Sequence, residues 1–357
     1  MTVLLVVLAV AFAWSMGAHY TGACMGMPHA LGAVTAWRAL LIMAPLTLLG
    51  AALASHGVAD TVGHGLLDGA GLGVAGQLVV LAVAFGMTTT FNRLRVPTST
   101  IQILVFAVVG AAVGAGTGVR WSTIAALAGI WVTAPLIAAG LGYLLTRAFD
   151  LIPSLRPVSG RVDLPDAPAR GAPPESGSTA EVPAVPVTVA RAGMPVFSFG
   201  LVAVGAIASF AMGANDVANA TGSLVGTRTL SPVVAGLVGG AGLALGVLTW
   251  GRPLLTKVAF DIVRVDRAMA SAAQLVQGVV VLVAVAFGYF TSMNQALVGA
   301  MVGAGVARGR RTVNRSSITS ILWGWLIGPA SGFLAAYLLA LLVAAATSGH
   351  TLKGPGR

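Results

Sequence analysis

The chain has 357 residues, of which 57% are apolar and only 8% carry a charged side chain. Soluble proteins usually carry about 25% charged residues, so this composition excludes an ordinary soluble domain. The net charge of +10 does not indicate nucleic-acid binding, because the basic residues are scattered through loops and tails without a basic face. The one cysteine, Cys24, excludes a disulfide framework and a cysteine metal cluster.

Apolar runs long enough to cross a lipid bilayer recur along the chain and predict an all-α polytopic membrane protein with about 10–12 membrane segments. Between the first runs, residues 55–70 are expected to form a loop. Whether the runs within 97–116 and 291–307 span the membrane or re-enter it stays open. The predicted segments are 2–18, 36–54, 72–91, 103–116 and 122–147, then 197–214, 232–250, 271–290, 296–307 and 317–346.

A segment rich in proline, serine and charge divides the chain into two halves. It cannot form a packed core, and it predicts a disordered linker. The expected domains are a first transmembrane repeat at 1–147, the linker at 148–196, a second repeat at 197–346 and a short tail at 347–357.

The two halves resemble each other at matched positions, which indicates an internal repeat. Met16-Gly-Ala18 aligns with Met212-Gly-Ala214, and Thr98-Ser-Thr-Ile-Gln102 aligns with Thr291-Ser-Met-Asn-Gln295. Further matched pairs are Gly26 with Gly222, Gly50 with Gly246, Gly110 with Gly303, Trp131 with Trp325 and Pro135 with Pro329.

Basic residues alternate between equivalent loops of the two halves. Loop 55–70 has no lysine or arginine, whereas 251–270 has four, and the bias reverses at each of the next two pairs of loops. Because basic residues favour the cytoplasmic side, equivalent loops are expected on opposite sides of the membrane. The pattern predicts an inverted-topology repeat in the cell (plasma) membrane, with a cytoplasmic linker and both termini outside.

Polar residues interrupt an apolar helix twice in each half, at 17–24 and 97–102 and at 213–223 and 291–295. Broken helices near the middle of a membrane expose N–H groups that suit an anion, and carbonyl, amide and carboxylate oxygens that suit a small cation. The hydroxyl and amide side chains there suit a tetrahedral oxyanion. Candidate substrate- and ion-binding residues are His19, Tyr20, Thr21, Thr98, Ser99, Thr100, Gln102, Asn215, Asp216, Asn219, Thr221, Thr291, Ser292, Asn294 and Gln295.

The segment Gly213-Ala-Asn-Asp-Val-Ala-Asn-Ala220 resembles the signature of the PiT inorganic phosphate transporter family. Ala296–Gly309, Val313-Asn314 and Trp325 support the resemblance, which covers nearly all of the chain outside the linker. It implies a symporter that imports inorganic phosphate with Na⁺ or H⁺ by alternating access. It also implies that Asn215, Asp216 and Asn219 bind ion and substrate, with a Na⁺ site near them.

The first half departs from the family signature. His19 and Tyr20 stand where the family has Asn and Asp, and Ala23 stands where it has the second Asn. Gln102 and Gln295 also replace histidines of the second polar motif. Losing one carboxylate favours sulfate, which has no proton to donate at neutral pH, so a sulfate permease of the same family is the alternative to phosphate. A non-transporting membrane sensor or scaffold is the second alternative.

The same polar residues also have purely structural interpretations. Asp216 could cap a helix, Asn215 and Asn219 could bond between helices, and His19 could be a neutral interhelical histidine instead of a proton-binding group. The sequence contains no nucleophile–base pair, phosphate-binding loop or metal motif, so an enzyme is not expected. Oligomeric state is open, with a homodimer as one option.

Overall fold

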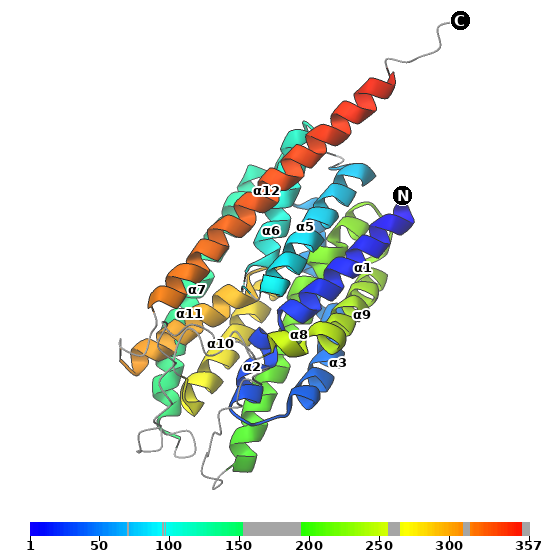
Figure 1. Ribbon diagram of the computed structural model, residues 1–357. Coiled ribbons are helices and arrows are strands. Elements are labelled where there is room, and N and C mark those ends of the chain that lie inside the picture. Colours follow the sequence, from blue (N-terminus) through cyan, green and yellow to red (C-terminus); the bar gives the residue numbers. More distant parts are fainter. Residues whose placement is uncertain are drawn as a thin grey trace, which may run out of the picture.

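The computed structural model describes residues 1–69, 71–94, 96, 98–152, 194–255, 265–309 and 315–351. Regular structure in these ranges is helical, and Figure 1 shows the helices as a bundle along one long axis. The first half forms α1 (Thr2–His19), α2 (Thr21–Ala30), α3 (Ala36–Ala54), α4 (His56–His64), α5 (Val74–Leu94), α6 (Thr100–Gly114) and α7 (Trp121–Phe149). The second half forms α8 (Met194–Gly226), α9 (Pro232–Trp250), the 3₁₀ turn η2 (Arg252–Leu254), α10 (Arg267–Ala286), α11 (Met293–Ala307) and α12 (Arg315–Thr351).

Eight of the helical segments in the described ranges are long and apolar enough to cross a membrane, and α6 and α11 are shorter apolar helices. The predicted spans 36–54 and 232–250 coincide with α3 and α9, so the prediction of a polytopic helical membrane protein is confirmed. Most of the predicted linker 148–196 and of the tail 347–357 lies outside the described residues, so the domain boundaries stay predictions.

Two local predictions were wrong. Loop 55–70 contains α4, which packs against α8 where Gly63 approaches the backbone of Gly222 and Gly226. The predicted break at 213–223 is absent, because α8 runs unbroken through it. The first half does break, at Tyr20 between α1 and α2.

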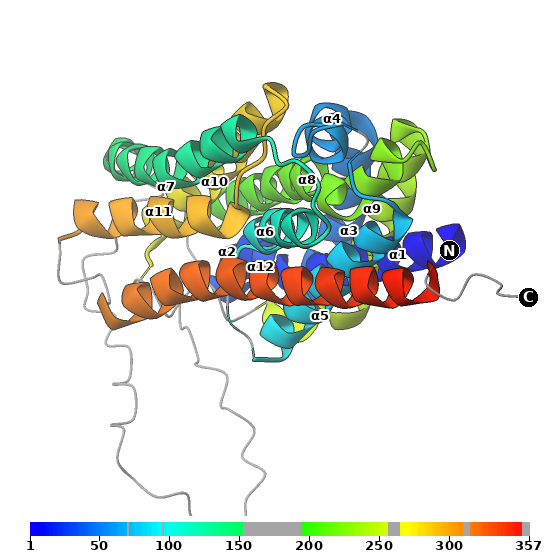
Figure 2. The ribbon, with the colours of Figure 1, turned by 90° about the horizontal axis from the view of Figure 1, so that it is seen from above.

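Helices of one half pack mainly against helices of the other. α1 packs on α9 and α3 on α8, while α6 packs on α12 and α7 on α11. Figure 2 shows the last two pairs side by side along the bundle. The hydrophobic core therefore depends on both halves.

Close backbone contacts repeat at a constant spacing between the halves. A Cβ on Gly17 would lie 2.0 Å from the carbonyl oxygen of Leu243, and a Cβ on Gly213 would lie 1.9 Å from that of Thr47. Residues 17 and 213, and residues 47 and 243, are each 196 positions apart, so one contact is the other with the halves exchanged. In Figure 1 the equivalent helices α1 and α8 run in opposite directions along the bundle, as expected of inverted repeats.

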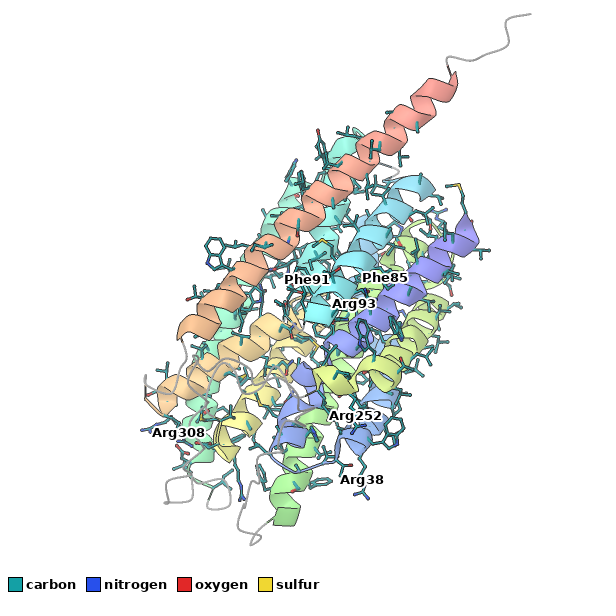
Figure 3. The ribbon with its side chains drawn as sticks, viewed as in Figure 1. Arg38, Phe85, Phe91, Arg93, Arg252 and Arg308 are labelled. Atoms are coloured by element: carbon teal, nitrogen blue, oxygen red, sulfur yellow. The ribbon has the colours of Figure 1, made fainter. Side chains whose placement is uncertain are left out.

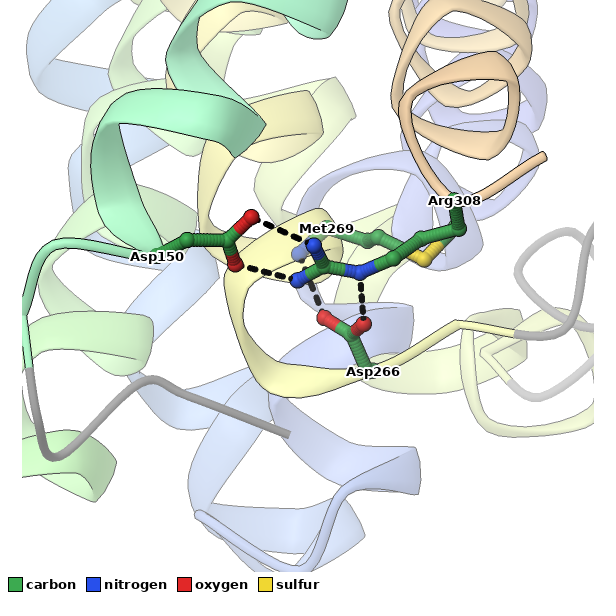
Figure 4. A network of polar contacts seen from close by, with 4 residues as sticks. All are labelled: Asp150, Asp266, Met269 and Arg308. Atoms are coloured by element: carbon green, nitrogen blue, oxygen red, sulfur yellow. Dashed lines mark hydrogen bonds and ion pairs between the residues drawn. The ribbon is translucent and has the colours of Figure 1, made fainter. Parts of the chain in front are cut away.

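One ionic cluster ties together the ends of α7, α10 and α11 (Figure 4). The Arg308 guanidinium donates to both carboxylate oxygens of Asp150 at 2.5 and 2.6 Å, and its Nε donates to Asp266 at 2.5 Å. Asp266 also caps α10 by accepting a hydrogen bond from the N–H of Met269 at 2.9 Å. The hydrogen bonds to Asp150 help to raise the pKa of Arg308, so the cluster stays charged.

We expect Arg308→Gln to lower the free energy of unfolding by about 1 to 3 kcal/mol, because it removes charged, bidentate hydrogen bonds from a mostly covered site. Thermal unfolding in detergent would measure the loss as a lower Tm. Arg120→Gln is the matched control, since its 3.5 Å contact with Asp68 is exposed and is expected to contribute less than about 1 kcal/mol. Equal Tm values for the two variants would contradict a stabilising role for the cluster.

Candidate anion and cation site

The N-termini of α6 and α11 meet in the interior of the bundle. Each helix has 15 residues, a length of about 22 Å, which is less than the roughly 30 Å apolar thickness of a bilayer. In Figure 1, α6 runs from the middle toward one end of the molecule and α11 runs toward the other. The Gln102 and Gln295 side-chain amides of their first turns donate to each other at 3.3 Å. The positive ends of two helix dipoles therefore face a shared region that suits an anion.

Buried hydroxyl groups surround these two helix starts. Ser99 and Ser292 cap α6 and α11 by accepting hydrogen bonds from the N–H groups of Gln102 and Gln295 at 3.4 Å. Thr100 and Tyr20 share a hydrogen bond of 2.7 Å between their hydroxyl oxygens. Two further hydroxyls, those of Thr98 and Thr291, are buried without a hydrogen-bond partner in the described part of the chain. They are available to donate to a bound oxyanion.

Among the described residues, Asp216 is the only acidic side chain that is buried, and it lies within α8. Its Oδ1 accepts a hydrogen bond from the Asn219 side chain at 3.1 Å. The described residues supply no partner for its Oδ2 or for the Oδ1 of Asn219. A buried carboxylate in a membrane is costly unless a positive charge or a proton compensates it, and these oxygens are ligands of the kind that Na⁺ takes.

Asn215 joins α8 to the start of α11 through both atoms of its amide. Its Nδ2 donates to the carbonyl oxygen of Thr291 at 2.9 Å, and its Oδ1 accepts from the N–H of Thr291 at 3.1 Å. The Asn215 side chain thus supplies hydrogen-bond partners to the N–H and carbonyl groups of Thr291, just before α11. Because a side chain makes these bonds, α8 stays helical. Asn215 therefore holds the start of α11 close to Asp216.

The first-half counterparts of these residues are His19 and Tyr20, at the α1–α2 break. The Nε2 of His19 lies 3.1 Å from the carbonyl oxygen of Thr98 and 3.2 Å from the Nδ2 of Asn294. The Tyr20 ring meets the His19 ring edge to face at a centroid distance of 5.1 Å, and Tyr20 also interacts with Asp216. The two halves of the site are therefore chemically different.

Two candidate threonines bond to backbone instead of facing the helix starts. The Thr221 hydroxyl donates to the carbonyl of Val217 within α8 at 3.0 Å. The Thr21 hydroxyl donates to Ala18 and Gly251 carbonyls at 3.0 and 2.9 Å. The structure brings the other candidates together around the starts of α6 and α11 and around Asp216.

Three amide side chains of the site were not predicted from the sequence. Asn92 of α5 contacts His19, and Gln274 and Gln277 of α10 bond to each other at 2.9 Å. Gln274 also donates to the carbonyl of Ala23 at 2.7 Å, where the family signature would place an asparagine. The signal that could have found them was an amide inside an apolar span, which is rare in membrane helices that face lipid.

Known proteins with similar sequences and folds identify the family of this chain. The model of the phosphate transporter family, PHO4, matches residues 16–336. A protein of Pyrococcus abyssi named "Putative phosphate permease" is 25% identical over 398 residues, covering 95% of this chain and 97% of its own length. The sulfate permease CysP of Bacillus subtilis is 24% identical over 334 residues, covering 93% of this chain and 85% of its own.

A solved structure described as the sodium-dependent phosphate transporter has the same fold, with a TM-score of 0.79 and 20% sequence identity. The likeness covers 96% of this chain and 99% of that chain. The family match extends from the α1–α2 break to α12 and includes every residue of the site described above. The chain is a multi-pass membrane protein that belongs to the phosphate transporter family.

Proposed function

We propose that this protein imports inorganic phosphate by alternating access, in symport with H⁺ or Na⁺. The observation that carries the proposal is the pairing of two unlike groups in one buried region. Unpartnered hydroxyls lie at two converging helix N-termini, and among the described residues an unpartnered carboxylate oxygen lies on the adjacent α8. Such a region suits an anion and a cation bound together better than either one bound separately.

The cation is assigned to Asp216 and Asn219, and the anion to the starts of α6 and α11. A cation at Asp216 would neutralise its charge and would also attract the anion, since Tyr20 interacts with Asp216 and shares a hydrogen bond with Thr100 at the start of α6. Asn215 holds Thr291 near this acid through its two backbone hydrogen bonds. Each ion would therefore favour binding of the other, which is the energetic requirement of a symporter.

Phosphate is placed ahead of sulfate because the region also offers hydrogen-bond acceptors. The Oδ1 of Asn294 is buried and has no partner in the described part of the chain, while its Nδ2 donates to Thr98 at 2.7 Å. Monohydrogen phosphate carries an O–H group that can donate to such an oxygen, whereas sulfate has none. Leaving a buried acceptor unpaired costs about 1 to 3 kcal/mol. The resemblance to a sulfate permease keeps sulfate as the second candidate.

The distribution of basic side chains supports a proposed orientation of the bundle in the membrane. Arg38, Arg252 and Arg308 lie toward the end at which α8 begins (Figure 3). Under the positive-inside rule this end is cytoplasmic, so the linker between the two repeats is cytoplasmic as well. The start of α1 and the end of α12 lie at the opposite end in Figure 1 and are assigned to the outside of the plasma membrane.

Exchange of labelled phosphate across reconstituted vesicles tests the assigned substrate. We expect sulfate to need a concentration about tenfold or more higher than unlabelled phosphate to inhibit the exchange equally. This difference corresponds to the cost of one unpaired buried acceptor. Arsenate, a tetrahedral anion that also carries an O–H group, is the matched control and is expected to compete like phosphate. Stronger competition by sulfate than by phosphate would contradict phosphate as the substrate and would favour sulfate.

A further inference from the structure

Positions 19 and 215 are equivalent in the repeat, 196 residues apart, but they carry different chemistry. Asn215 holds the backbone of Thr291 with both amide atoms. His19 approaches the backbone of Thr98, the equivalent of Thr291, through its ring nitrogen Nε2. An amide does not take up a proton near neutral pH, whereas an imidazole does. The first half therefore has a titratable imidazole where the second half has an amide that does not titrate.

The surroundings of His19 determine which ring nitrogen always carries hydrogen. The Nδ2 of Asn92 donates to the carbonyl and hydroxyl oxygens of Ser15 at 2.8 and 3.2 Å. The Oδ1 of Asn92 therefore faces the Nδ1 of His19, at 2.5 Å, and can only accept. Nδ1 is the permanent donor of the ring, which leaves Nε2 as the nitrogen that gains or loses a proton.

Nε2 has one partner for each of its two states. Without a proton it accepts a hydrogen bond from the Asn294 side chain, and with a proton it donates to the Thr98 carbonyl. Asn294 keeps its own 2.7 Å bond to the same carbonyl in both states. Nε2 thus has a hydrogen-bond partner in each form of the ring without a change of the His19 rotamer. In the protonated form the Asn294 N–H loses Nε2 as its acceptor.

We propose that Nε2 of His19 is the proton-binding site of the transport cycle, an assignment that rests on the proposed phosphate symport. The neutral imidazole takes one proton from the side to which the site is open, giving an imidazolium, and releases it on the other side. No bond to the substrate forms or breaks. The added positive charge lies beside Thr98 and the N-terminus of α6, so proton binding strengthens anion binding.

Among the described residues, the other titratable or charged side chains near His19 form no hydrogen bond with its ring nitrogens. The Tyr20 ring meets it edge to face, and Asp216 of α8 interacts with Tyr20. Arg93 of α5 and Arg252 of η2 are exposed. Asn92 and Asn294, which touch the ring nitrogens, carry no charge. The proton at His19 and the cation at Asp216 are therefore separate sites in the two halves.

The test uses the full chain in vesicles that contain no Na⁺, with uptake of labelled phosphate driven by an inward proton gradient. His19→Asn places at this position the amide found at 215. We expect proton-driven uptake to fall about tenfold or more, and the remaining uptake, compared at equal concentrations of monohydrogen phosphate, to be flat between about pH 5.5 and pH 8. His64→Gln, at an exposed histidine paired with Asp60, is the matched control and is expected to keep the wild-type profile.

The outcomes distinguish a failure of the role assigned to His19 from a failure of the proposed phosphate symport. A His19→Asn protein that responds to the proton gradient like wild type overturns the role of His19. Wild-type uptake that responds to Na⁺ and not to pH overturns it too, while leaving phosphate symport intact. If wild type takes up no phosphate under either gradient, the proposed function itself fails.

A second variant guards against a His19→Asn protein that does not fold. Asn92→Asp places a carboxylate against Nδ1 and favours the imidazolium, so the midpoint of the uptake pH profile should rise by about one unit or more. Adding His19→Asn to this variant should remove the rise. An unshifted midpoint in Asn92→Asp would contradict a proton at His19.

Discussion

Asp216→Asn is expected to reduce cation-driven phosphate uptake about 100-fold or more. The substitution keeps the shape of the side chain and its contact with Asn219, but it removes the negative charge that binds the cation. Removing one partner of a buried charge pair typically costs about 3 to 5 kcal/mol, and 3 kcal/mol is more than 100-fold in affinity. Folding should be retained, because a neutral amide is less costly than a carboxylate inside a membrane.

Initial rates of labelled phosphate uptake under a Na⁺ gradient would measure this loss. Asp68→Asn is the matched control, because Asp68 is an acid outside the helices that pairs with Arg120 through an exposed contact of 3.5 Å. It is expected to leave the rates within about twofold of wild type. An Asp216→Asn protein with a wild-type rate and wild-type cation dependence would refute the assignment of the cation site.

Gly213→Ala is expected to destabilise the protein and to abolish transport in the same step. A Cβ at this position would lie 1.9 Å from the Thr47 carbonyl oxygen and 2.8 Å from the Ala51 N–H nitrogen, so α8 and α3 would have to separate. Because these atoms belong to backbone, no side-chain rotation relieves the clash. Overpacking typically costs about 1 to 3 kcal/mol or more. The shift would also displace Asn215 and Asp216, which follow within one helical turn.

A lower Tm in detergent and loss of phosphate uptake would be measured on the same preparation. Gly200→Ala is the matched control, since it lies on the same helix, is exposed and would have no atom within 4 Å of its added Cβ. It should match or slightly exceed wild-type stability, as alanine favours a helix by about 1 kcal/mol over glycine. Equal Tm values for Gly213→Ala and Gly200→Ala would show that the close approach of α3 and α8 is not required.

Much of the fold could be predicted because its causes are local. The length and apolarity of the runs correctly predicted both ends of α3 and of α9. Matched glycines indicated a repeat, and the contacts of those glycines recur at a constant spacing between the halves. The errors came from contacts between distant segments. The polar segment 213–223 predicted a break in the helix, but the Asn215 side chain reaches Thr291 and α8 stays helical. Helix α4 likewise depends on packing against α8.

The site could be predicted only in part for a similar reason. Thr98–Gln102 and Thr291–Gln295 stood out because short polar motifs recur in both halves. Asn92 and Gln274 are isolated amides in apolar helices, and only the fold places them against His19 and Ala23. The sequence showed that the first half had lost a carboxylate, but not that neighbouring helices supply polar groups around the gap.

The most direct test of cation-coupled phosphate transport is whether vesicles concentrate phosphate. Purified protein would be reconstituted with equal phosphate on both sides and an inward Na⁺ or proton gradient, and internal phosphate would be followed over time. If phosphate and a cation are transported together, internal phosphate rises above the external concentration and returns to it when an ionophore removes the gradient. Phosphate that stays equal on both sides under either gradient would contradict symport and would favour a sensor or scaffold.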